Sequence, residues 1–389
     1  LKLFNNVYDK YTSSSYDLYF NDDIKISISN EFNIEVDNID NNLIKINKNT
    51  LNYEKIKDEE YKIINRKDKL EYSWIYNLGI FLFKNVRLYF NDCLIDEYYS
   101  DMYQIYSELI KYSGSIDGGN KLIGNVDKLI TVNSKKKDKY KLIIPTLFWF
   151  SLYDDINIPI IALPYSKIKI EVLFEDIKNL IICDYNKDNL IFENTDKLNT
   201  NLITNLIYLE ESERKLVANK RHEYLIEQYQ YNGKYKIEDI NNINININFS
   251  NCIKDMFYVI NTNNKTQKVN YTLNETDIVN GGNPILSSSL TLSGQKRFNN
   301  LSGVYTNYIV PYEKYYSTPS DGINVFSFAE YPLLYQPSGC LNFSEINDIK
   351  LNLEIDKTKI NVKDIYYVDV YARSYNILRI MSGMGEILF

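Results

Sequence analysis

Apolar and polar residues alternate with a period of two in several segments of the chain, which is the pattern of strands that bury one face. In residues 243–249 three isoleucines and a phenylalanine occupy every second position, with asparagines between them. Residues 349–355 repeat the pattern, with isoleucine and leucine set against lysine, asparagine and glutamate. Such strands, separated by connections rich in glycine, asparagine and serine, are typical of an antiparallel sandwich.

A third alternation lies near the end of the chain, in residues 367–378. We expect one of its faces to lie in a core and the other to face solvent. The two faces are Val368, Val370 and Ala372 against Asp369, Tyr371 and Arg373. Further strands are expected at residues 24–28, 32–36, 74–90, 141–150, 160–174 and 222–231.

Two helices are predicted, and the second divides the chain. Residues 97–112 carry apolar and aromatic side chains at helical spacing. Residues 211–219 have glutamates toward the start and arginine and lysine toward the end, an order that complements the helix dipole. Strand-rich segments lie on both sides of the second helix, and 389 residues exceed what one core usually serves.

We therefore expect an all-β fold of two tandem antiparallel jelly-roll sandwiches, with a few short helices in loops and at the join. The expected division is residues 1–209 for the N-terminal jelly roll, 210–220 for the connecting helix and 221–389 for the C-terminal jelly roll.

Net charge and cysteine content argue against nucleic-acid binding and against a cysteine metal site. The net charge of −7 argues against the basic surface that nucleic-acid binding requires, so no direct sequence-specific nucleic-acid binding is expected. The four cysteines have no metal-type spacing and are expected to be reduced. No segment approaches the roughly 20 apolar residues that cross a bilayer.

His222 is the only histidine of the chain. A jelly-roll metal site needs several histidines and a catalytic triad would need this one, but His222 opens a predicted strand and is read as structural. Phosphate-binding glycine motifs do not occur either. We predict no catalytic, cofactor-binding or metal-binding residue and no enzyme activity. A carboxylate pair acting on a sugar stays open, because acidic residues are abundant but no local pattern singles out a pair.

Six N-x-S/T sequons occur in the chain. A sequence this rich in asparagine, serine and threonine contains about as many by chance, so unmodified asparagine is the simpler reading. The candidates for glycosylation are the clustered Asn264, Asn270 and Asn274.

Two segments near the end of the chain carry a family resemblance. Residues 324–347 read NVFSFAEYPLLYQPSGCLNFSEIN, and residues 379–389 read RIMSGMGEILF. Both resemble the C-terminal signature of the major capsid proteins of nucleocytoplasmic large DNA viruses. Other similar segments follow in family order: KLIGNVDKL from Lys121, LFWF from Leu147, IPIIALPYSKIKIEVLF from Ile158, YLEESERKLVANKRHEYLIEQ from Tyr208 and ILSSSLTLSGQKRF from Ile285.

The signature has a structural explanation. Pro337 fixes φ, Ser338 can bond to nearby backbone and Gly339 can adopt a positive φ, so the chain can turn after a strand. Phe343 is expected to return to the core, and the glycines of SGMG are expected to allow close backbone approach. The signature residues are Gln336, Pro337, Ser338, Gly339, Asn342, Phe343, Ser344, Gly383 and Gly385.

The resemblance implies a structural, non-catalytic protein that assembles as a homotrimeric, pseudo-hexagonal capsomer and tiles an icosahedral shell around a viral genome. Implied partners are other copies of the chain, minor capsid and penton proteins, and an internal membrane beneath the shell. The implied location is the virion, after late synthesis and assembly in the host cytoplasm. Residues 1–15 are similar to the family region that follows a short N-terminal arm, so an arm is expected ahead of them.

The chain departs from the family pattern at three places. One follows SGMG, where the family usually continues with glycine and small residues but this chain has Glu386, Ile387, Leu388 and Phe389. Cys340 and Leu341 follow the turn where the family usually has Thr-Cys, and Glu345 stands where arginine is common. A cation replaced by an anion would invert an ion pair at that point. These departures leave open a minor or paralogous double jelly-roll capsid or scaffold protein. A carbohydrate-binding jelly-roll protein is a separate second alternative.

Overall fold

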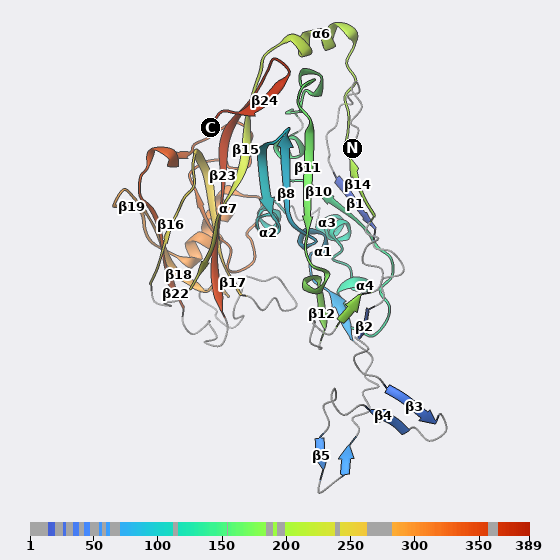
Figure 1. Ribbon diagram of the computed structural model, residues 1–389. Coiled ribbons are helices and arrows are strands. Elements are labelled where there is room, and N and C mark those ends of the chain that lie inside the picture. Colours follow the sequence, from blue (N-terminus) through green and yellow to red (C-terminus); the bar gives the residue numbers. More distant parts are fainter. Residues whose placement is uncertain are drawn as a thin grey trace.

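The computed structural model describes residues 71–111, 116–153, 155–183, 199–237, 242–262, 282–356 and 365–389. It also gives the backbone of seven short strands outside these ranges, namely β1 (Ser15–Tyr19), β2 (Ile26–Ile28), β3 (Ile34–Asn38), β4 (Leu43–Ile46), β5 (Glu54–Ile56), β6 (Glu60–Lys62) and β13 (Leu190–Phe192). Helix α6 (Glu211–Asn219) connects two strand-rich halves that lie side by side (Figure 1), here called the N-terminal and C-terminal halves.

The C-terminal half is a sandwich of two antiparallel sheets. The first sheet has the order β15 (His222–Lys236), β23 (Tyr366–Met381), β17 (Cys252–Thr262) and β20 (Asn324–Ser327), with β21 (Leu341–Asn342) paired to β17 and β24 (Met384–Ile387) paired to β23. The second sheet has the order β16 (Asn242–Asn246), β22 (Ile349–Ile355), β18 (Ile285–Leu292) and β19 (Gln295–Ser302).

The alternation of apolar and polar residues explains why the two sheets pack against each other. The isoleucines of β16 and the leucines of β22 are buried, whereas Asn244 and Asn246 are exposed, as the alternation predicted. Opposite them, Val368, Val370 and Ala372 of β23 complete the same core. Burial of these branched apolar side chains drives the two sheets together.

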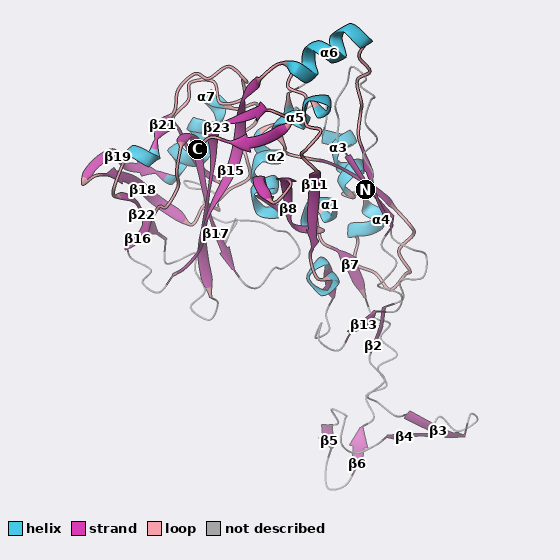
Figure 2. Cartoon of the chain, turned by 45° about the horizontal axis from the view of Figure 1, so that its top comes forward, coloured by secondary structure: helices cyan, strands magenta, loops and turns pink. Residues whose placement is uncertain are grey.

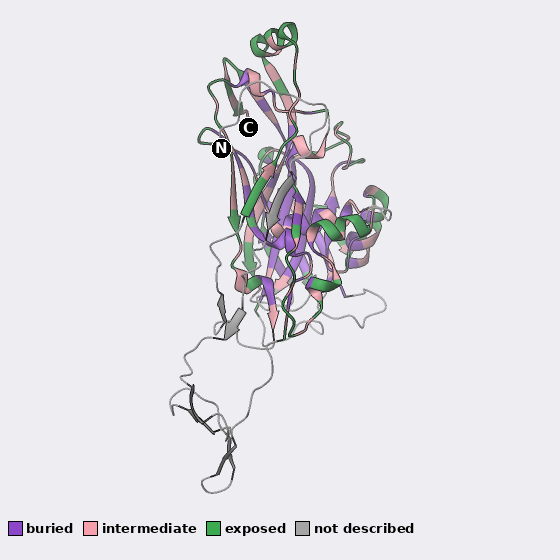
Figure 3. Cartoon of the chain, turned by 90° about the vertical axis from the view of Figure 1, so that its right-hand side faces the viewer, coloured by how far each residue is buried: buried purple, intermediate pink, exposed green. Residues whose placement is uncertain are grey.

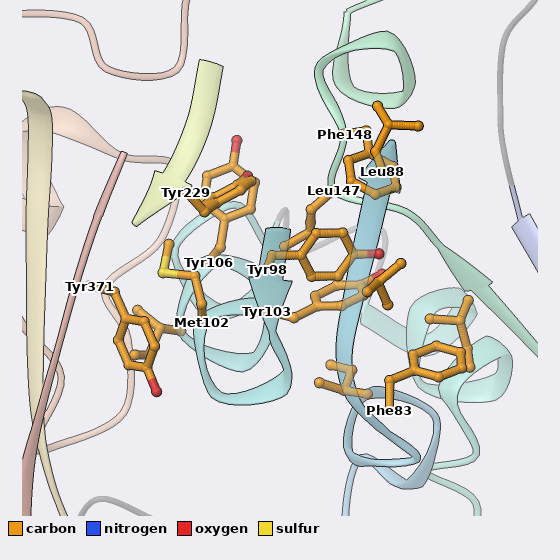
Figure 4. Packing of buried hydrophobic residues seen from close by; sticks show 14 of the residues in the cluster. Phe83, Leu88, Tyr98, Met102, Tyr103, Tyr106, Leu147, Phe148, Tyr229 and Tyr371 are labelled. Atoms are coloured by element: carbon orange, nitrogen blue, oxygen red, sulfur yellow. The ribbon is translucent and has the colours of Figure 1, made fainter. Parts of the chain in front are cut away.

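The other face of β23 contradicts the prediction that it meets solvent. Asp369 and Arg373 are completely buried, and Tyr371 is almost completely buried. The reason is that the N-terminal half covers this face. Tyr371 belongs to a second core that also contains Tyr98 and Tyr106 of the N-terminal half (Figure 4). The first sheet of the C-terminal half is therefore buried on both sides.

The N-terminal half is built from smaller antiparallel sheets (Figure 2). Their orders are β10 (Lys141–Pro145), β1 and β14 (Asn199–Ile203); β11 (Ile168–Phe174), β8 (Phe83–Phe90) and β9 (Cys93–Tyr99); β12 (Ile181–Cys183) with β7 (Tyr72–Trp74); β13 with β2; β3 with β4; and β5 with β6. Residues of both halves share one buried core, and buried residues fill the middle of the molecule in Figure 3, whereas α6 buries none of its side chains.

Three predicted strands are interrupted. Residues 74–90 contain α1 (Leu78–Phe81) between β7 and β8, because Asn77 adopts a left-handed φ of 56° that turns the chain. Residues 141–150 leave the strand at Pro145, which has no N–H for a sheet, and continue into α5 (Trp149–Leu152). Residues 160–174 begin with a short 3-10 turn, η2 (Ile160–Ala162), before β11.

The two predicted helices have different outcomes. Helix α6 has the bounds expected, and Glu210 and Glu213 form a capping box at its start. In contrast, the helix predicted for residues 97–112 is α2 (Ser100–Leu109), because residues 97–99 still belong to β9. The remaining short helices are α3 (Ile116–Ile123), α4 (Asp127–Ile130), η3 (Ile177–Leu180), the π-helical turn η5 (Tyr305–Ile309), α7 (Val310–Lys314) and η6 (Phe343–Glu345).

Candidate functional site

Four charged side chains lie in the seam between the two halves with almost no access to solvent. They are Glu227 of β15, Lys254 and Asp255 of β17, and Arg373 of β23. These three strands are neighbours in one sheet, so antiparallel pairing brings the charges together. Two anions and two cations make the cluster formally neutral, as buried charges must be to avoid a large desolvation cost. We call these four residues the charge cluster.

Arg373 is the centre of the charge cluster. Its Nε lies 2.9 Å from Oδ1 of Asp255, and its Nη2 also donates to Asp255. Its Nη1 lies 3.4 Å from Oε2 of Glu227, whose other oxygen accepts from Nζ of Lys254. Burial lowers the pKa of Lys254, and the positive charge of Arg373 lowers it further.

Tyrosines from both halves complete the hydrogen bonds of the carboxylates. Tyr153, just after α5, donates to Oε1 of Glu227 over 2.8 Å, and Tyr315, just after α7, donates to Oδ2 of Asp255 over 2.7 Å. The guanidinium of Arg373 lies 4.8 Å from the ring centre of Tyr106 in α2. Since Tyr106 and Tyr153 belong to the N-terminal half, the charge cluster bonds the two halves to each other.

The charge cluster also holds the loop that contains the signature turn. Nη2 of Arg373 donates to the carbonyl oxygen of Pro332 over 3.0 Å, and Nζ of Lys254 lies 3.3 Å from that of Leu334. Tyr335 spans the seam, because its hydroxyl donates to the carbonyl of Leu225 and its ring packs against Tyr153. The loop at residues 328–340 is thus fixed by buried cations rather than by a sheet.

The signature turn closes this loop on itself. Oγ of Ser338 accepts from the N–H of Tyr331 over 2.8 Å, and the Ser338 carbonyl accepts from the N–H of Glu330. Gly339 has a φ of 139°, and a Cβ there would stand 2.7 Å from the carbonyl oxygen of Phe328. Gln336, Pro337 and Gly339 are exposed. Only glycine fits this position without moving backbone.

The NFS element lies beside β17. Phe343 is buried and its N–H donates to the Asn251 carbonyl over 2.9 Å. The Asn342 side chain accepts from the N–H of Ser344, and the Ser344 hydroxyl accepts from the N–H of Asn251. Glu345 is exposed and forms no ion pair with any residue that the structure describes, so the inverted ion pair considered above has no counterpart there.

The SGMG element is the tip of the β23–β24 hairpin and contacts the N-terminal half. The carbonyl of Gly383 accepts from the N–H of Tyr165 over 3.1 Å, and the N–H of Gly385 donates to Ser166. A Cβ on Gly383 would lie 2.4 Å from the Tyr165 ring, and one on Gly385 would lie 2.6 Å from the Phe90 ring. Both glycines therefore permit close approach of the halves.

A second polar contact crosses the seam at Asp96 of β9. Its Oδ1 accepts from the N–H of Tyr229 in β15 over 3.1 Å and from the N–H of Glu97. Its Oδ2 has no hydrogen-bond partner among the described residues. Burial raises the pKa of Asp96 to about 8. The seam thus contains a carboxyl group that ionises with difficulty.

Sequence reasoning missed both the charge cluster and Asp96. One signal was available: Lys254 and Asp255 stand side by side within the apolar strand sequence CIKDMFYVI. Charges in the middle of such a strand are costly unless they are paired. Periodicity could not identify their partners, which lie 27 and 118 residues away in the chain.

The remaining predictions concern glycosylation, the cysteines and His222, and metal or membrane binding. The glycosylation candidates Asn264, Asn270 and Asn274 lie outside the described residues. The four cysteines are free thiols, and His222 bonds through Nε2 to the carbonyl of Val217. Within the described ranges, no group of three or more His, Cys, Asp or Glu is arranged to hold a metal ion, and no helix is long and apolar enough to span a membrane.

Two family models match the chain in succession. The model described as major capsid protein N-terminus matches residues 4–210, and the model described as large eukaryotic DNA virus major capsid protein matches residues 213–386. The major capsid protein of Pyramimonas orientalis virus is 29% identical over 332 residues, which cover 79% of this chain and 76% of that protein. The major capsid protein of Paramecium bursaria Chlorella virus 1 is 26% identical over 353 residues, 79% of each chain.

Solved structures agree with these matches. The quasi-atomic model of the PBCV-1 virus capsid aligns with a TM-score of 0.68 at 20% identity and covers 98% of this chain and 90% of that one. The Faustovirus major capsid protein aligns with a TM-score of 0.70 at 11% identity and covers 98% and 87%. These likenesses show the fold, which is the predicted pair of tandem antiparallel jelly rolls with short helices. With its N-terminal model alone matching residues 4–210, this chain belongs to the major capsid protein family of large eukaryotic DNA viruses.

Proposed function

We propose that the chain is a structural shell protein whose three copies form a pseudo-hexagonal capsomer, and that capsomers tile an icosahedral capsid around the viral genome. The proposal rests on the close contact between the N-terminal and C-terminal halves. The first sheet of the C-terminal half is buried on both faces, and the charge cluster bonds it to the N-terminal half. Two sandwiches locked side by side form one rigid block, and three such blocks supply six sandwiches around a threefold axis.

We propose the boundary between the jelly rolls at residues 210–220, with residues 1–209 and 221–389 as the two domains. The two family matches end at residue 210 and begin at residue 213, which supports this division. Helix α6 begins at Glu211, and β15 begins at His222. The capping box of α6 favours a helix that starts at a fixed residue and therefore a fixed connection.

The signature residues act, in this proposal, as structural elements and not as a catalytic site. They hold the loop at residues 328–340 and the β23–β24 hairpin against the rest of the fold. The protein is proposed to have no enzyme activity and no cofactor. Its partners would be other copies of itself, minor capsid and penton proteins and an underlying membrane, and it would be made late, in the host cytoplasm, for the virion.

Native mass spectrometry of the purified full chain tests the assembly. We expect a species of three chains at micromolar concentration. The small-angle X-ray scattering curve of that species should fit a particle with a pseudo-hexagonal outline. A chain that stays monomeric at every concentration would sink the proposal. A monomer that binds glycans would instead favour the carbohydrate-binding alternative.

A second candidate is a minor or paralogous capsid protein. It is favoured by Cys340 and Glu345, which depart from the family signature at exposed positions. Quantitative proteomics of purified virions separates the two candidates. A principal capsomer should be the most abundant protein of the particle, whereas a paralogue should be scarce.

A further inference from the structure

Two cysteines from distant parts of the chain meet beside the signature turn. Cys252 is the first residue of β17, and Cys340 stands between Gly339 and the start of β21. The thiol of Cys340 is in hydrogen-bonding contact with the thiol of Cys252. Since Cys340 is exposed and Cys252 is half-buried, the two thiols meet at the surface of the molecule.

The register of two strands explains why these thiols face each other. In the antiparallel pairing of β21 with β17, Leu341 lies opposite Ile253, and Asn342 lies opposite Cys252. Ile253 is completely buried in the core of the C-terminal sandwich, and Leu341 packs against the same core. Successive side chains of a strand point to opposite faces, so Cys252 and Cys340 both point away from that core.

The position of the cysteine after the turn is what makes the contact. This chain departs from the family pattern here, with cysteine at residue 340 and leucine at residue 341. A cysteine one residue later would lie on the inward face, opposite Ile253, whereas Cys340 lies on the same face as Cys252. The departure therefore places a second thiol beside Cys252.

We propose that Cys252 and Cys340 form a disulfide bond when the chain meets a small-molecule disulfide such as oxidised glutathione, and that the bond fastens the end of the loop at residues 328–340 to β17. Both cysteines are free thiols in the structure, which therefore shows the reduced form. A reducing cytosol disfavours such a bond, and an oxidising environment outside the cell favours it. The bond requires only the folded chain and does not depend on capsomer assembly.

The exchange needs no further reactant. The thiolate of the exposed Cys340 attacks one sulfur of oxidised glutathione, whose S–S bond breaks and releases one glutathione thiolate. The thiolate of Cys252 then attacks the Cys340 sulfur of this mixed disulfide, forms the bond between the two cysteines and releases the second glutathione. The two protons of the protein thiols pass to the two glutathione thiolates. Two cysteines are oxidised, and one glutathione disulfide is reduced.

The bond would add a covalent link to a loop that hydrogen bonds already hold elsewhere. At the start of the loop the N–H of Phe328 donates to the Lys254 carbonyl, and further along Nζ of Lys254 lies 3.3 Å from the carbonyl oxygen of Leu334. Cys340 is the last residue of the loop. A link from Cys340 to Cys252 closes a long stretch of chain, which restricts the unfolded state and should stabilise the fold.

Peptide mass spectrometry without reduction tests the disulfide. The purified full chain is incubated with oxidised glutathione at about pH 9, where thiolates are more abundant than at neutral pH, and is then unfolded and digested in acid. We expect a linked pair of peptides that contain Cys252 and Cys340, and an intact mass lower by two hydrogen atoms. Cys340→Ser should abolish the linked pair, whereas Cys93→Ser, which removes another exposed cysteine, should leave it unchanged.

Two further measurements test the order of attack and the effect on the fold. In Cys252→Ser the mixed disulfide of Cys340 with glutathione has no second thiol to resolve it, so it should accumulate about tenfold or more over wild type. Oxidised wild type should unfold on heating about 5 °C above the reduced protein, and Cys340→Ser should show no such difference.

The outcomes separate the two parts of the proposal. A wild type that keeps both thiols, carries only glutathione adducts, or links Cys340 to another cysteine would overturn the disulfide. A bond between Cys252 and Cys340 that leaves the unfolding temperature unchanged would overturn the fastening of the loop.

Discussion

Arg373 and Asp255 form an ion pair that solvent does not reach. Nε of Arg373 lies 2.9 Å from Oδ1 of Asp255, and both side chains have no exposed area. Removing charges from water costs several kcal/mol per ion, and only complete hydrogen bonding offsets that cost. Here Tyr315 and the Pro332 carbonyl supply the remaining partners. The pair therefore fixes the signature loop, and replacing either residue is expected to destabilise the fold.

The Arg373→Met variant tests this dependence. It leaves Asp255 buried without its principal cation and frees the Pro332 carbonyl, so we expect the free energy of unfolding to fall by about 3–5 kcal/mol. Equilibrium unfolding in urea measures the loss.

Arg379→Met is the matched control, because Arg379 lies on the same strand. Its Nε lies 2.9 Å from Glu223, but both side chains are partly exposed. An exposed pair contributes about 0–1 kcal/mol, so the control should lose little. Equal losses for the two variants would contradict the assigned role of burial.

Gly339→Ala tests the geometry of the signature turn. The added Cβ would stand 2.7 Å from the Phe328 carbonyl, and backbone cannot yield as a side chain can. We expect a loss of about 2 kcal/mol or more in the free energy of unfolding. Gly233→Ala is the control, since Gly233 has a φ of 84° but open space around it. If both variants lose the same amount, the close approach to Phe328 is not what requires glycine.

The raised pKa of Asp96 is expected to make the free energy of unfolding depend on pH. Burial raises its pKa in the folded protein to about 8 from an ordinary 3.8, so the folded state holds this proton more tightly than the unfolded state. The favourable contribution is complete below pH 3.8 and is lost as the pH rises to about 8. The groups facing it are Tyr229, Glu97 and Glu227.

Asp96→Asn isolates this contribution, because an amide has no proton to lose. Between pH 5 and pH 8 the unfolding free energy of wild type should fall by about 2–4 kcal/mol relative to that of the variant. Urea unfolding of both proteins at several pH values measures the difference. Parallel curves would show that Asp96 ionises freely in the seam.

Cys340 should react slowly in the folded protein. Although Cys340 is an exposed residue, partial desolvation of its thiol, together with the neighbouring Cys252 thiol, raises the pKa of Cys340 to about 11. The thiolate is the reactive form, so the rate of alkylation should rise about tenfold per pH unit up to that value. Mass spectrometry of peptides after timed iodoacetamide treatment follows the reaction. An inflection near pH 8.5, the usual value for a free thiol, would show that neither partial desolvation nor the Cys252 thiol raises the pKa of Cys340.

Local signals made part of the fold predictable. The start of α6 is encoded by Glu210 and Glu213, whose capping box acts within one turn. The alternation of β16 and β22 reports their own burial, because one face of each strand meets a core and the other meets solvent. These signals need no knowledge of distant residues.

The second face of β23 was not predictable in this way. Asp369 and Arg373 look like solvent-facing residues, yet both are completely buried, and Tyr106 of the N-terminal half lies against the Arg373 guanidinium. The same holds for Asp96, which is polar by sequence and buried only because β15 lies across it. Contacts between elements far apart in sequence decide burial here. The alternation of residues within one strand does not show which other elements will pack against it.

Electron cryomicroscopy of the purified, assembled protein tests the central claim most directly. We predict three chains around a threefold axis and six jelly-roll densities in a pseudo-hexagonal outline. Particles that contain one chain, or assemblies without threefold symmetry, would contradict it.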